Sequence, residues 1–403
     1  MATMTMTKHP LEQLAETNPE SEIWWDSSPL IYPSWKAETL AAAPDATHAD
    51  WTEQLTRFFD ADTIAAKGTM GFRGVTTNPP LSLQAISVDP EGWSARIREI
   101  AAADRSASVE EVYWAMYLDL VKRGADAIRP VWDASGGKFG FLSGQVDPRF
   151  VTDYDRMLAM GLTIAAQGPN VMVKIPGSME GYAVIEELTA LGIATNNTTS
   201  FTVSQYMKCM AAVTAGLQRA KAAGVDLTNW RSVITHMSSR LGEKGDWKIE
   251  AKARGIDLSL MEIRDGEEAV LKRAYWWGKQ NNHPSKMLQC SMRVEKDDAG
   301  HTVSRHIQDF GGSDMVYTCP GSYIAQLMEA ADQLSFDPHA IEREPNAASI
   351  EKLMKLPSFR QAYEFEGLKP AEFAQFGSFQ ATATEFAAAT RQTVDIVRMT
   401  LES

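Results

Sequence analysis

The pattern of apolar and polar positions alternates between short runs and longer stretches. Eight short runs have the character of strands: Glu22–Asp26, Gly71–Thr77, Gly140–Val146, Val171–Pro176, Ile193–Thr199, Ser232–Met237, Met287–Arg293 and Asp314–Thr318. Between them, segments such as Tyr182–Leu191 and Val203–Ala223 carry apolar residues at helical spacing, and Gly224 is a stop signal after the second. This alternation predicts an α/β fold with a parallel sheet and crossover helices, and eight strands favour a closed (β/α)8 TIM barrel over an open sheet.

The chain divides into three predicted parts. Residues 1–20 have the composition of a flexible N-terminal arm, and residues 21–335 contain the eight runs of the barrel. Residues 336–403 are helical in pattern, with Gly and Pro as breaks. We expect this last part to form an extension that packs on the barrel or covers its mouth.

Charge and cysteine content exclude several classes of function. A net charge of −13 on 403 residues disfavours nucleic acid or an anionic membrane as a partner. We find no apolar leader and no run of about 18 apolar residues, so we expect a cytoplasmic protein. The three cysteines and seven histidines are scattered without metal-ligand spacing, so we expect neither a metal nor an organic cofactor. The composition does not decide the oligomeric state, and a homo-oligomer is compatible with it.

Polar and reactive side chains gather where the predicted strands end. They are Asp26, Asn78, Gln145, Lys174, Asn196, Thr198, Thr235 and Arg240. In a (β/α)8 barrel the carboxyl ends of the strands form the catalytic face, so these residues predict an active site there.

Lys174 has the strongest chemical signal of this set. It lies in VMVKIP, where Val171, Val173 and Ile175 would bury its stem inside a barrel strand. Burial disfavours the charged ammonium and leaves a neutral amine that can attack a carbonyl, as Schiff-base enzymes require. On the strand pattern alone, a lysine whose ammonium extends to water is an equally good interpretation.

Five blocks in order resemble the transaldolase family. The stretch from Pro169 to Phe201 resembles the signature in which the Schiff-base lysine precedes Ile-Pro, a Glu-Gly pair and Asn-x-Thr. The blocks IWWD, GVTTNPP, GQVDPR and SVITHMSSR resemble the first, second, third and sixth strands of the family. The likeness runs from about Ile23 to Pro320, and it implies a (β/α)8 barrel enzyme of carbohydrate metabolism, specifically of the pentose phosphate pathway.

The resemblance implies roles for the matching residues. Lys174 would form the imine with a ketose, and Asp26 would exchange a proton with the C4 hydroxyl. Thr198 and Asn196 would orient a catalytic water and the donor hydroxyls, and Asn78 would bind the hydroxyls of the three-carbon donor unit. A loop or helix-capping role is the structural alternative for Asp26.

Three positions depart from the family pattern. Gln145 stands where transaldolases have an acid/base glutamate, as it does in fructose 6-phosphate aldolases, and an amide cannot carry the proton. In the sixth-strand block, Thr235 and Met237 replace a serine and an aromatic residue as substrate contacts. Arg240 is the predicted phosphate anchor, with a structural salt bridge as its alternative, and Arg293 is a second candidate anion contact.

These observations lead to one main hypothesis and two alternatives. We expect a transaldolase-type transferase that moves a dihydroxyacetone unit from a ketose or ketose phosphate to an aldehyde through Lys174. A Schiff-base aldolase that releases free dihydroxyacetone is the first alternative, favoured by Gln145. A catalytically idle barrel that binds sugar phosphates or a protein partner is the second.

Overall fold

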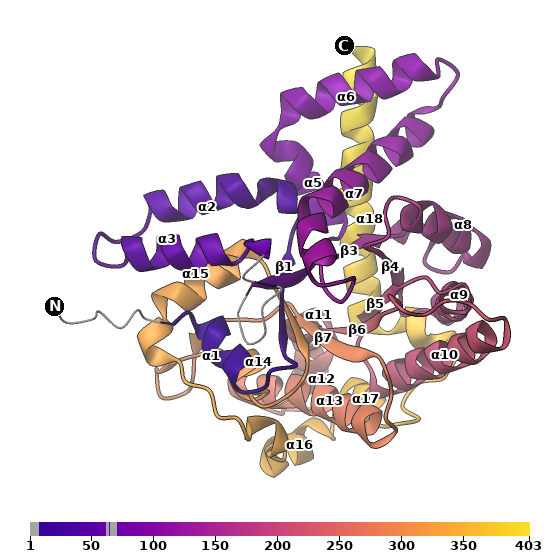
Figure 1. Ribbon diagram of the computed structural model, residues 1–403. Helices are drawn as coiled ribbons and strands as arrows, with labels where there is room; N and C mark the ends of the chain where they lie inside the picture. Colours follow the sequence, from indigo (N-terminus) through magenta and orange to yellow (C-terminus); the bar gives the residue numbers. More distant parts are fainter. Residues whose placement is uncertain (1–7, 62–63, 65–70) are drawn as a thin grey trace.

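Eight parallel strands close into a barrel in the computed structural model, which describes residues 8–61, 64 and 71–403 (Figure 1). The strands are β1 (Glu22–Asp26), β2 (Phe72–Thr76), β3 (Phe141–Gln145), β4 (Val171–Pro176), β5 (Thr195–Ser200), β6 (Ser232–Met237), β7 (Lys286–Cys290) and β10 (Val316–Cys319). They follow one another around the barrel in chain order, and β10 closes it by pairing with β1. The predicted (β/α)8 fold class is confirmed.

The barrel strands are buried along nearly their whole length, since helices cover their outer face and side chains fill the interior. Their bounds differ from the predicted runs by a few residues. The largest difference is in β7, which ends at Cys290 and not at Arg293. Ser291 has a φ of 57°, in the left-handed region, so the extended conformation cannot continue through it.

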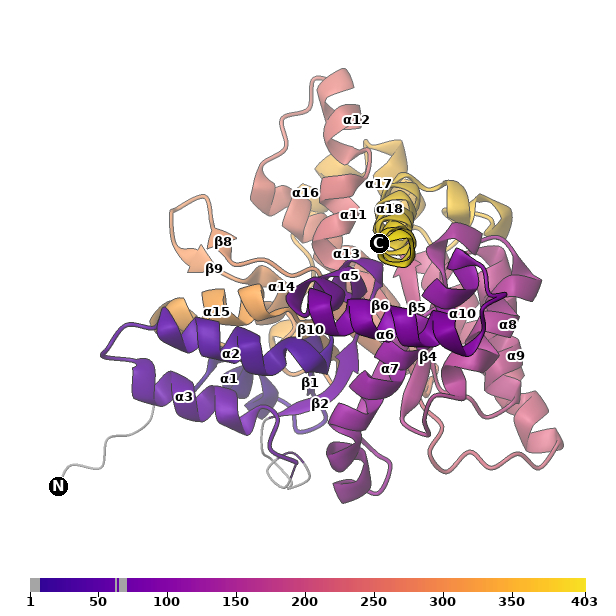
Figure 2. The same cartoon turned by 90° about the horizontal axis from the view of Figure 1, so that it is seen from above.

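Helices connect the strands and extend the barrel (Figure 2). They are α1 (Pro10–Glu16), α2 (Tyr32–Ala41), α3 (His48–Arg57), α5 (Pro79–Val88), α6 (Pro90–Ala103), α7 (Val109–Ala134), α8 (Tyr154–Ala165), α9 (Met179–Ala190), α10 (Val203–Ala222), α11 (Ser238–Lys244), α12 (Trp247–Ala253), α13 (Leu260–Gln280), α14 (Arg305–Gln308), α15 (Gly321–Glu329), α16 (Ala347–Leu353), α17 (Pro357–Tyr363) and α18 (Gly377–Glu402). Two further strands, β8 (Glu295–Lys296) and β9 (Thr302–Val303), form a small antiparallel hairpin. Capping boxes at Ser108, Thr202 and Ser259 begin three of the longest helices by satisfying their first backbone N–H groups.

The N-terminal segment is docked from His9 onward. His9 caps α1, and the side chains of Leu11 and Leu14 are fully buried. The part of the predicted flexible arm that the structure describes is therefore ordered against the barrel, because two leucines supply an apolar face. Residues 1–7 of that arm lie outside the described residues.

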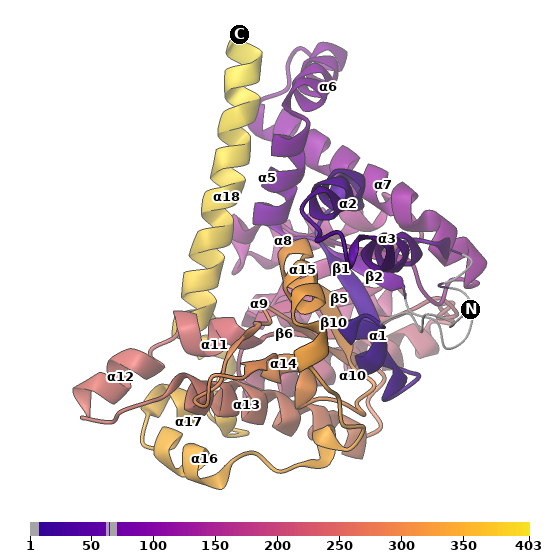
Figure 3. The same ribbon diagram turned by 90° about the vertical axis from the view of Figure 1, so that its left-hand side faces the viewer.

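Helix α18 crosses the barrel at the end where the strands terminate (Figure 3). It packs against α5 and α11, which begin directly after β2 and β6, and against the 3₁₀ turn η2 (Pro148–Phe150) after β3. The C-terminal helix thus lies on the face that barrels use for ligands. None of the described helices is long and apolar enough to cross a membrane.

A buried ion-pair cluster closes the opposite end of the barrel. Glu22 begins β1, and its carboxylate accepts hydrogen bonds from Arg231 at 2.5 Å and from Lys286 at 2.9 Å. The indole of Trp24 donates a third hydrogen bond to it at 3.1 Å. One buried carboxylate therefore ties the start of β1 to the residue before β6 and to the start of β7.

Candidate active site

A cavity of about 220 Å³ opens at the carboxyl ends of the strands. Its walls come from six of the eight strands or the loops that follow them, and from helices α5, α11 and α18. The lining residues are Asp26, Thr76, Asn78, Pro80, Leu81, Lys174, Thr235, Met237, Arg240, Leu288, Cys290, Ser291, Met292, Arg293, Thr318, Pro320 and Phe386. Seven of the ten predicted site residues are among them; Gln145, Asn196 and Thr198 are not.

Lys174 projects into this cavity from β4. Its side chain is buried, and the ammonium nitrogen lies 3.0 Å from the carbonyl oxygen of Thr77, to which it donates. Burial lowers the pKa of Lys174 below its ordinary value, and the nearby carboxylate of Asp26 opposes that shift. Lys174 therefore lies in the barrel interior, as predicted, and its ammonium does not extend to water.

Asp26 ends β1 and faces the same cavity. Thr76 donates a hydrogen bond of 2.6 Å to its Oδ1, and Thr318 lies 2.6 Å from the Thr76 hydroxyl. Burial raises the pKa of Asp26, while Lys174 and the Thr76 hydrogen bond oppose the rise. Burial therefore disfavours the charged form of both side chains, and Asp26 and Lys174 are a coupled pair in which each opposes the shift that burial causes in the other.

Asn196 is the middle member of a row of three hydrogen-bonded side chains. Its amide donates to the hydroxyl of Ser143 at 3.0 Å and its carbonyl accepts from Thr235 at 2.7 Å. The row joins β3, β5 and β6, and Asn196 is also the register neighbour of Lys174. Both ends of the Asn196 side chain are therefore fixed, and Thr235 is the member of the row that reaches the cavity wall.

Gln145 and Thr198 lie on the strands that flank Lys174. Gln145 pairs in register with Lys174 itself, and Thr198 pairs with Pro176. Among the described residues, neither Gln145 Oε1 nor Thr198 Oγ1 has a hydrogen-bond partner, although both atoms are buried. Gln145 borders a separate void of about 10 Å³, close to the space one water requires. Tyr117 of α7 borders the same void and fixes the Gln145 backbone through two hydrogen bonds of 2.8 Å.

Asn78 follows β2 and has two structural roles. Its side-chain oxygen accepts a hydrogen bond of 3.0 Å from the backbone N–H of Leu81 and so caps α5, while the residue lines the cavity. Its predicted contact with donor hydroxyls would use the side-chain N–H₂.

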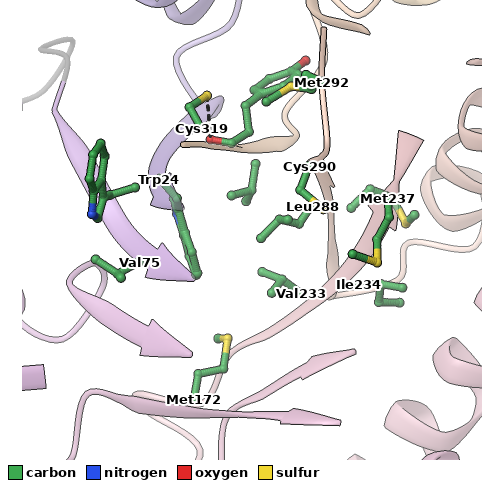
Figure 4. Packing of buried hydrophobic residues seen from close by; sticks show 14 of the residues in the cluster. Trp24, Val75, Met172, Val233, Ile234, Met237, Leu288, Cys290, Met292 and Cys319 are labelled. Atoms are coloured by element: carbon green, nitrogen blue, oxygen red, sulfur yellow. Dashed lines mark hydrogen bonds between the residues drawn. The ribbon is translucent and has the colours of Figure 1, made fainter. Parts of the chain in front are cut away.

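One wall of the cavity is apolar and sulfur-rich. Met237 ends β6, and Cys290 and Met292 come from the end of β7 and the loop after it (Figure 4). Burial, with a contribution from Asp26, raises the pKa of Cys290 to about 12, so its thiol is protonated at neutral pH. Met237 occupies the position where the sequence suggested a substrate contact, and it offers a polarizable apolar surface there.

The two cavity arginines are both ion-paired. Both terminal nitrogens of Arg240 donate to the carboxylate of Glu385 on α18, at 2.8 and 3.0 Å. Arg293 donates to Glu243 at 3.0 Å and to its neighbouring carbonyl of Met292 at 3.1 Å. The salt bridge considered as an alternative for Arg240 is present, and its partner comes from a helix 145 residues further along the chain.

Several cavity residues had no signal in the sequence. Cys290 lies inside a predicted strand outside the five blocks, and Phe386 belongs to the C-terminal extension. Thr76 lies within the GVTTNPP block, which could have indicated it, but only Asn78 of that block was given a role. The position of Phe386 depends on how α18 docks, which local sequence does not encode.

The fold and site define a (β/α)8-barrel protein with a buried lysine and carboxylate in a pocket on its catalytic face. The family described as Transaldolase/Fructose-6-phosphate aldolase matches residues 58–375, most of the chain. The protein belongs to this family, and the sequence-based assignment to transaldolase-type enzymes is confirmed at that level. The match begins after β1, so the block that contains Asp26 lies outside it. The roles assigned to all ten predicted site residues, Lys174 and Asp26 included, stay predictions.

Curated relatives agree with the family. The chain is 36% identical over 240 residues to Transaldolase 1 of Streptomyces avermitilis, and the aligned residues cover 58% of this chain and 62% of the relative. It is 33% identical over 306 residues to the transaldolase of Saccharopolyspora erythraea, covering 73% of this chain and 82% of the relative. Transaldolase 2 of Streptomyces coelicolor is 29% identical over 329 residues, with coverage of 77% and 87%.

Proposed function

We propose that the protein transfers a dihydroxyacetone unit from a ketose to an aldehyde through an imine on Lys174. The observation that carries this proposal is the coupled pair in the cavity: an amine whose pKa is lowered by burial beside a carboxyl whose pKa is raised by it. A cavity of about 220 Å³ holds roughly seven water-sized volumes, enough for a three-carbon unit with its hydroxyls. Family membership supports sugars and sugar phosphates as the substrate class.

The reaction divides between the two residues. The neutral amine of Lys174 attacks the C2 carbonyl, and loss of water from the carbinolamine gives the imine. Asp26 accepts the proton of the C4 hydroxyl while the C3–C4 bond breaks. The electron pair of that bond moves into the imine to give an enamine, and an aldehyde leaves. The enamine carbon then attacks the acceptor aldehyde, Asp26 returns the proton to the new hydroxyl, and water hydrolyses the imine to release the new ketose.

Gln145 favours a second candidate, an aldolase that releases free dihydroxyacetone. An amide can hold water through its carbonyl but cannot relay a proton, so hydrolysis of the imine would depend on the water and Asp26. The buried Oε1 of Gln145 and Oγ1 of Thr198, without partners among the described residues, are suited to bind such a water. Product analysis with and without an aldehyde acceptor separates the two candidates, since an aldolase turns over without one.

Borohydride trapping tests the imine directly. We expect incubation with fructose 6-phosphate, sedoheptulose 7-phosphate or dihydroxyacetone, followed by reduction, to give a mass increase on the peptide that contains Lys174. Lys272 supplies a matched control, because it is also a poorly exposed lysine whose pKa burial lowers, but it lies on α13 and donates to two backbone carbonyls. Lys174→Arg should abolish trapping and Lys272→Arg should retain it. Trapping at Lys272, or on the Lys174→Arg variant, would refute the assignment.

A further inference from the structure

The carboxylate of Glu385 lies against the anion-binding edge of Arg240. The contact is bidentate, with Nη2 to Oε1 at 2.8 Å and Nη1 to Oε2 at 3.0 Å, and Lys244 donates to Oε2 at 3.1 Å. The hydrogen bond from Arg240 holds the pKa of Glu385 at about 2, so this carboxylate is ionised at any physiological pH. A guanidinium that faces a carboxylate in this way presents to it the same fork that it would present to a phosphate.

One partner of this ion pair, Arg240, belongs to the cavity wall. Arg240 and Phe386, the residue after Glu385, both line the cavity, and the Arg240 guanidinium lies 5.4 Å from the centre of the Phe386 ring. Arg240 is also close enough to influence the pKa values of Lys174 and Asp26. A ligand that reaches from Lys174 to Arg240 therefore comes to a guanidinium whose two terminal nitrogens already donate to Glu385.

The second arginine of the cavity, Arg293, is not a free anion-binding group either. Arg293 is paired with Glu243, which also accepts from Arg264. Both cavity guanidinium groups are thus matched by a carboxylate before any ligand enters. A phosphate would have to displace Glu385 or bind beside it against charge repulsion, whereas a neutral hydroxyl would have to do neither.

We propose that Glu385 is a specificity-determining residue that occupies the anion-binding edge of Arg240 and lowers the preference of the cavity for phosphorylated over unphosphorylated sugars. The substrate part of this inference rests on the proposed function; the competition between Glu385 and phosphate does not. The two parts are therefore tested by separate measurements.

The first measurement is calorimetric titration of the full chain with inorganic phosphate. Glu385→Gln should bind phosphate about fivefold more tightly than the native chain, the upper end of the range for one partly exposed ion pair. The matched control is Asp395→Asn, which removes the same charge from α18 at an exposed residue paired with Arg398. It should leave phosphate affinity within about twofold.

Two further variants keep the titration decisive. In Glu385→Gln combined with Arg240→Gln, phosphate affinity should return to the native level or below. A double variant that binds as tightly as Glu385→Gln would place the phosphate elsewhere and overturn the proposal. Glu385→Asp keeps the charge but withdraws it by one methylene, so it should give a smaller gain and serves if the Gln variant does not fold. Unchanged affinity in a folded Glu385→Gln variant also overturns the proposal.

The second measurement compares borohydride trapping of Lys174 by fructose 6-phosphate and by fructose. The ratio of the two trapping rates should rise about fivefold in Glu385→Gln and stay at the native value in Asp395→Asn. An unchanged or lower ratio, with phosphate affinity raised, would refute the specificity role. Absence of any adduct in every variant would refute the proposed function instead, while the phosphate titration still decides whether Glu385 competes for Arg240.

Discussion

Glu22→Gln is a perturbation whose energetic effect can be worked from the structure. The Glu22 carboxylate is 2% exposed and lies at the end of the barrel opposite the cavity, between Arg231 and Lys286. Burial by itself would raise its pKa, but the two cations outweigh burial and lower the pKa to about 2 from an ordinary 4.5. The amide of glutamine keeps the shape of the side chain and removes the charge.

The size of the effect follows from linkage between protonation and folding. Because the pKa is lower in the folded state, the carboxylate stabilises the fold at every pH above about 4.5, and this contribution is lost as the pH falls toward 2. A shift of this size corresponds to about 3 kcal/mol of stability at pH 7. At pH 3.5 the same relation leaves about 2 kcal/mol.

Differential scanning calorimetry is the assay. For a chain of this length, about 3 kcal/mol corresponds to a fall in Tm of roughly 3 to 4 °C at pH 7, and the fall should shrink to roughly 60% of that value at pH 3.5. Glu20→Gln is the control, because that side chain is 60% exposed and only 4.0 Å from the same lysine, and it should change Tm by less than about 1 °C. Turnover per folded molecule should be unchanged in both variants. An equal fall in Tm at pH 7 and pH 3.5 would refute the electrostatic reasoning.

Four other substitutions have expected outcomes. Asp26→Asn removes the charge that raises the pKa of Lys174, so the pH profile of borohydride trapping should move to lower pH while turnover falls roughly 10² to 10⁴-fold; an unmoved profile would contradict the coupling. Gln145→Glu supplies a group that can relay a proton, and steady-state product analysis should find a higher ratio of transfer to free dihydroxyacetone. Tyr117→Phe deletes both hydrogen bonds to the Gln145 backbone and should cost about 1 to 3 kcal/mol by denaturant titration, more than Tyr154→Phe at the half-buried first residue of α8. Gly74→Ala would place a methyl group 2.4 Å from the ring of Trp24, so Tm measurement should find a strongly destabilised barrel.

The barrel could be predicted because its strands and helices are encoded locally. Each strand is a short buried run, each crossover helix has its own periodicity and cap, and chain order around the barrel follows from the right-handed βαβ connection. The positions of Lys174 and Asp26 on one face of the barrel could be predicted for the same reason. Lys174 and Asp26 lie at the carboxyl ends of strands, and a closed barrel brings all such ends to one face.

The partner of Arg240 could not be predicted from the local sequence. The sequence placed Arg240 after the sixth strand and offered two interpretations, a phosphate anchor or a salt bridge, and the structure contains the salt bridge at the cavity wall. What decides between the interpretations is the carboxylate of Glu385, which reaches Arg240 only because α18 packs across α5, α11 and η2. That docking is a sum of contacts among segments hundreds of residues apart, so no motif near Arg240 carries it. The two interpretations also need not exclude each other, since a guanidinium that holds a carboxylate at rest can exchange it for a stronger anion. The affinity of the pocket for phosphate is then the difference between two ion pairs on one arginine, and a single charge on the C-terminal helix sets it.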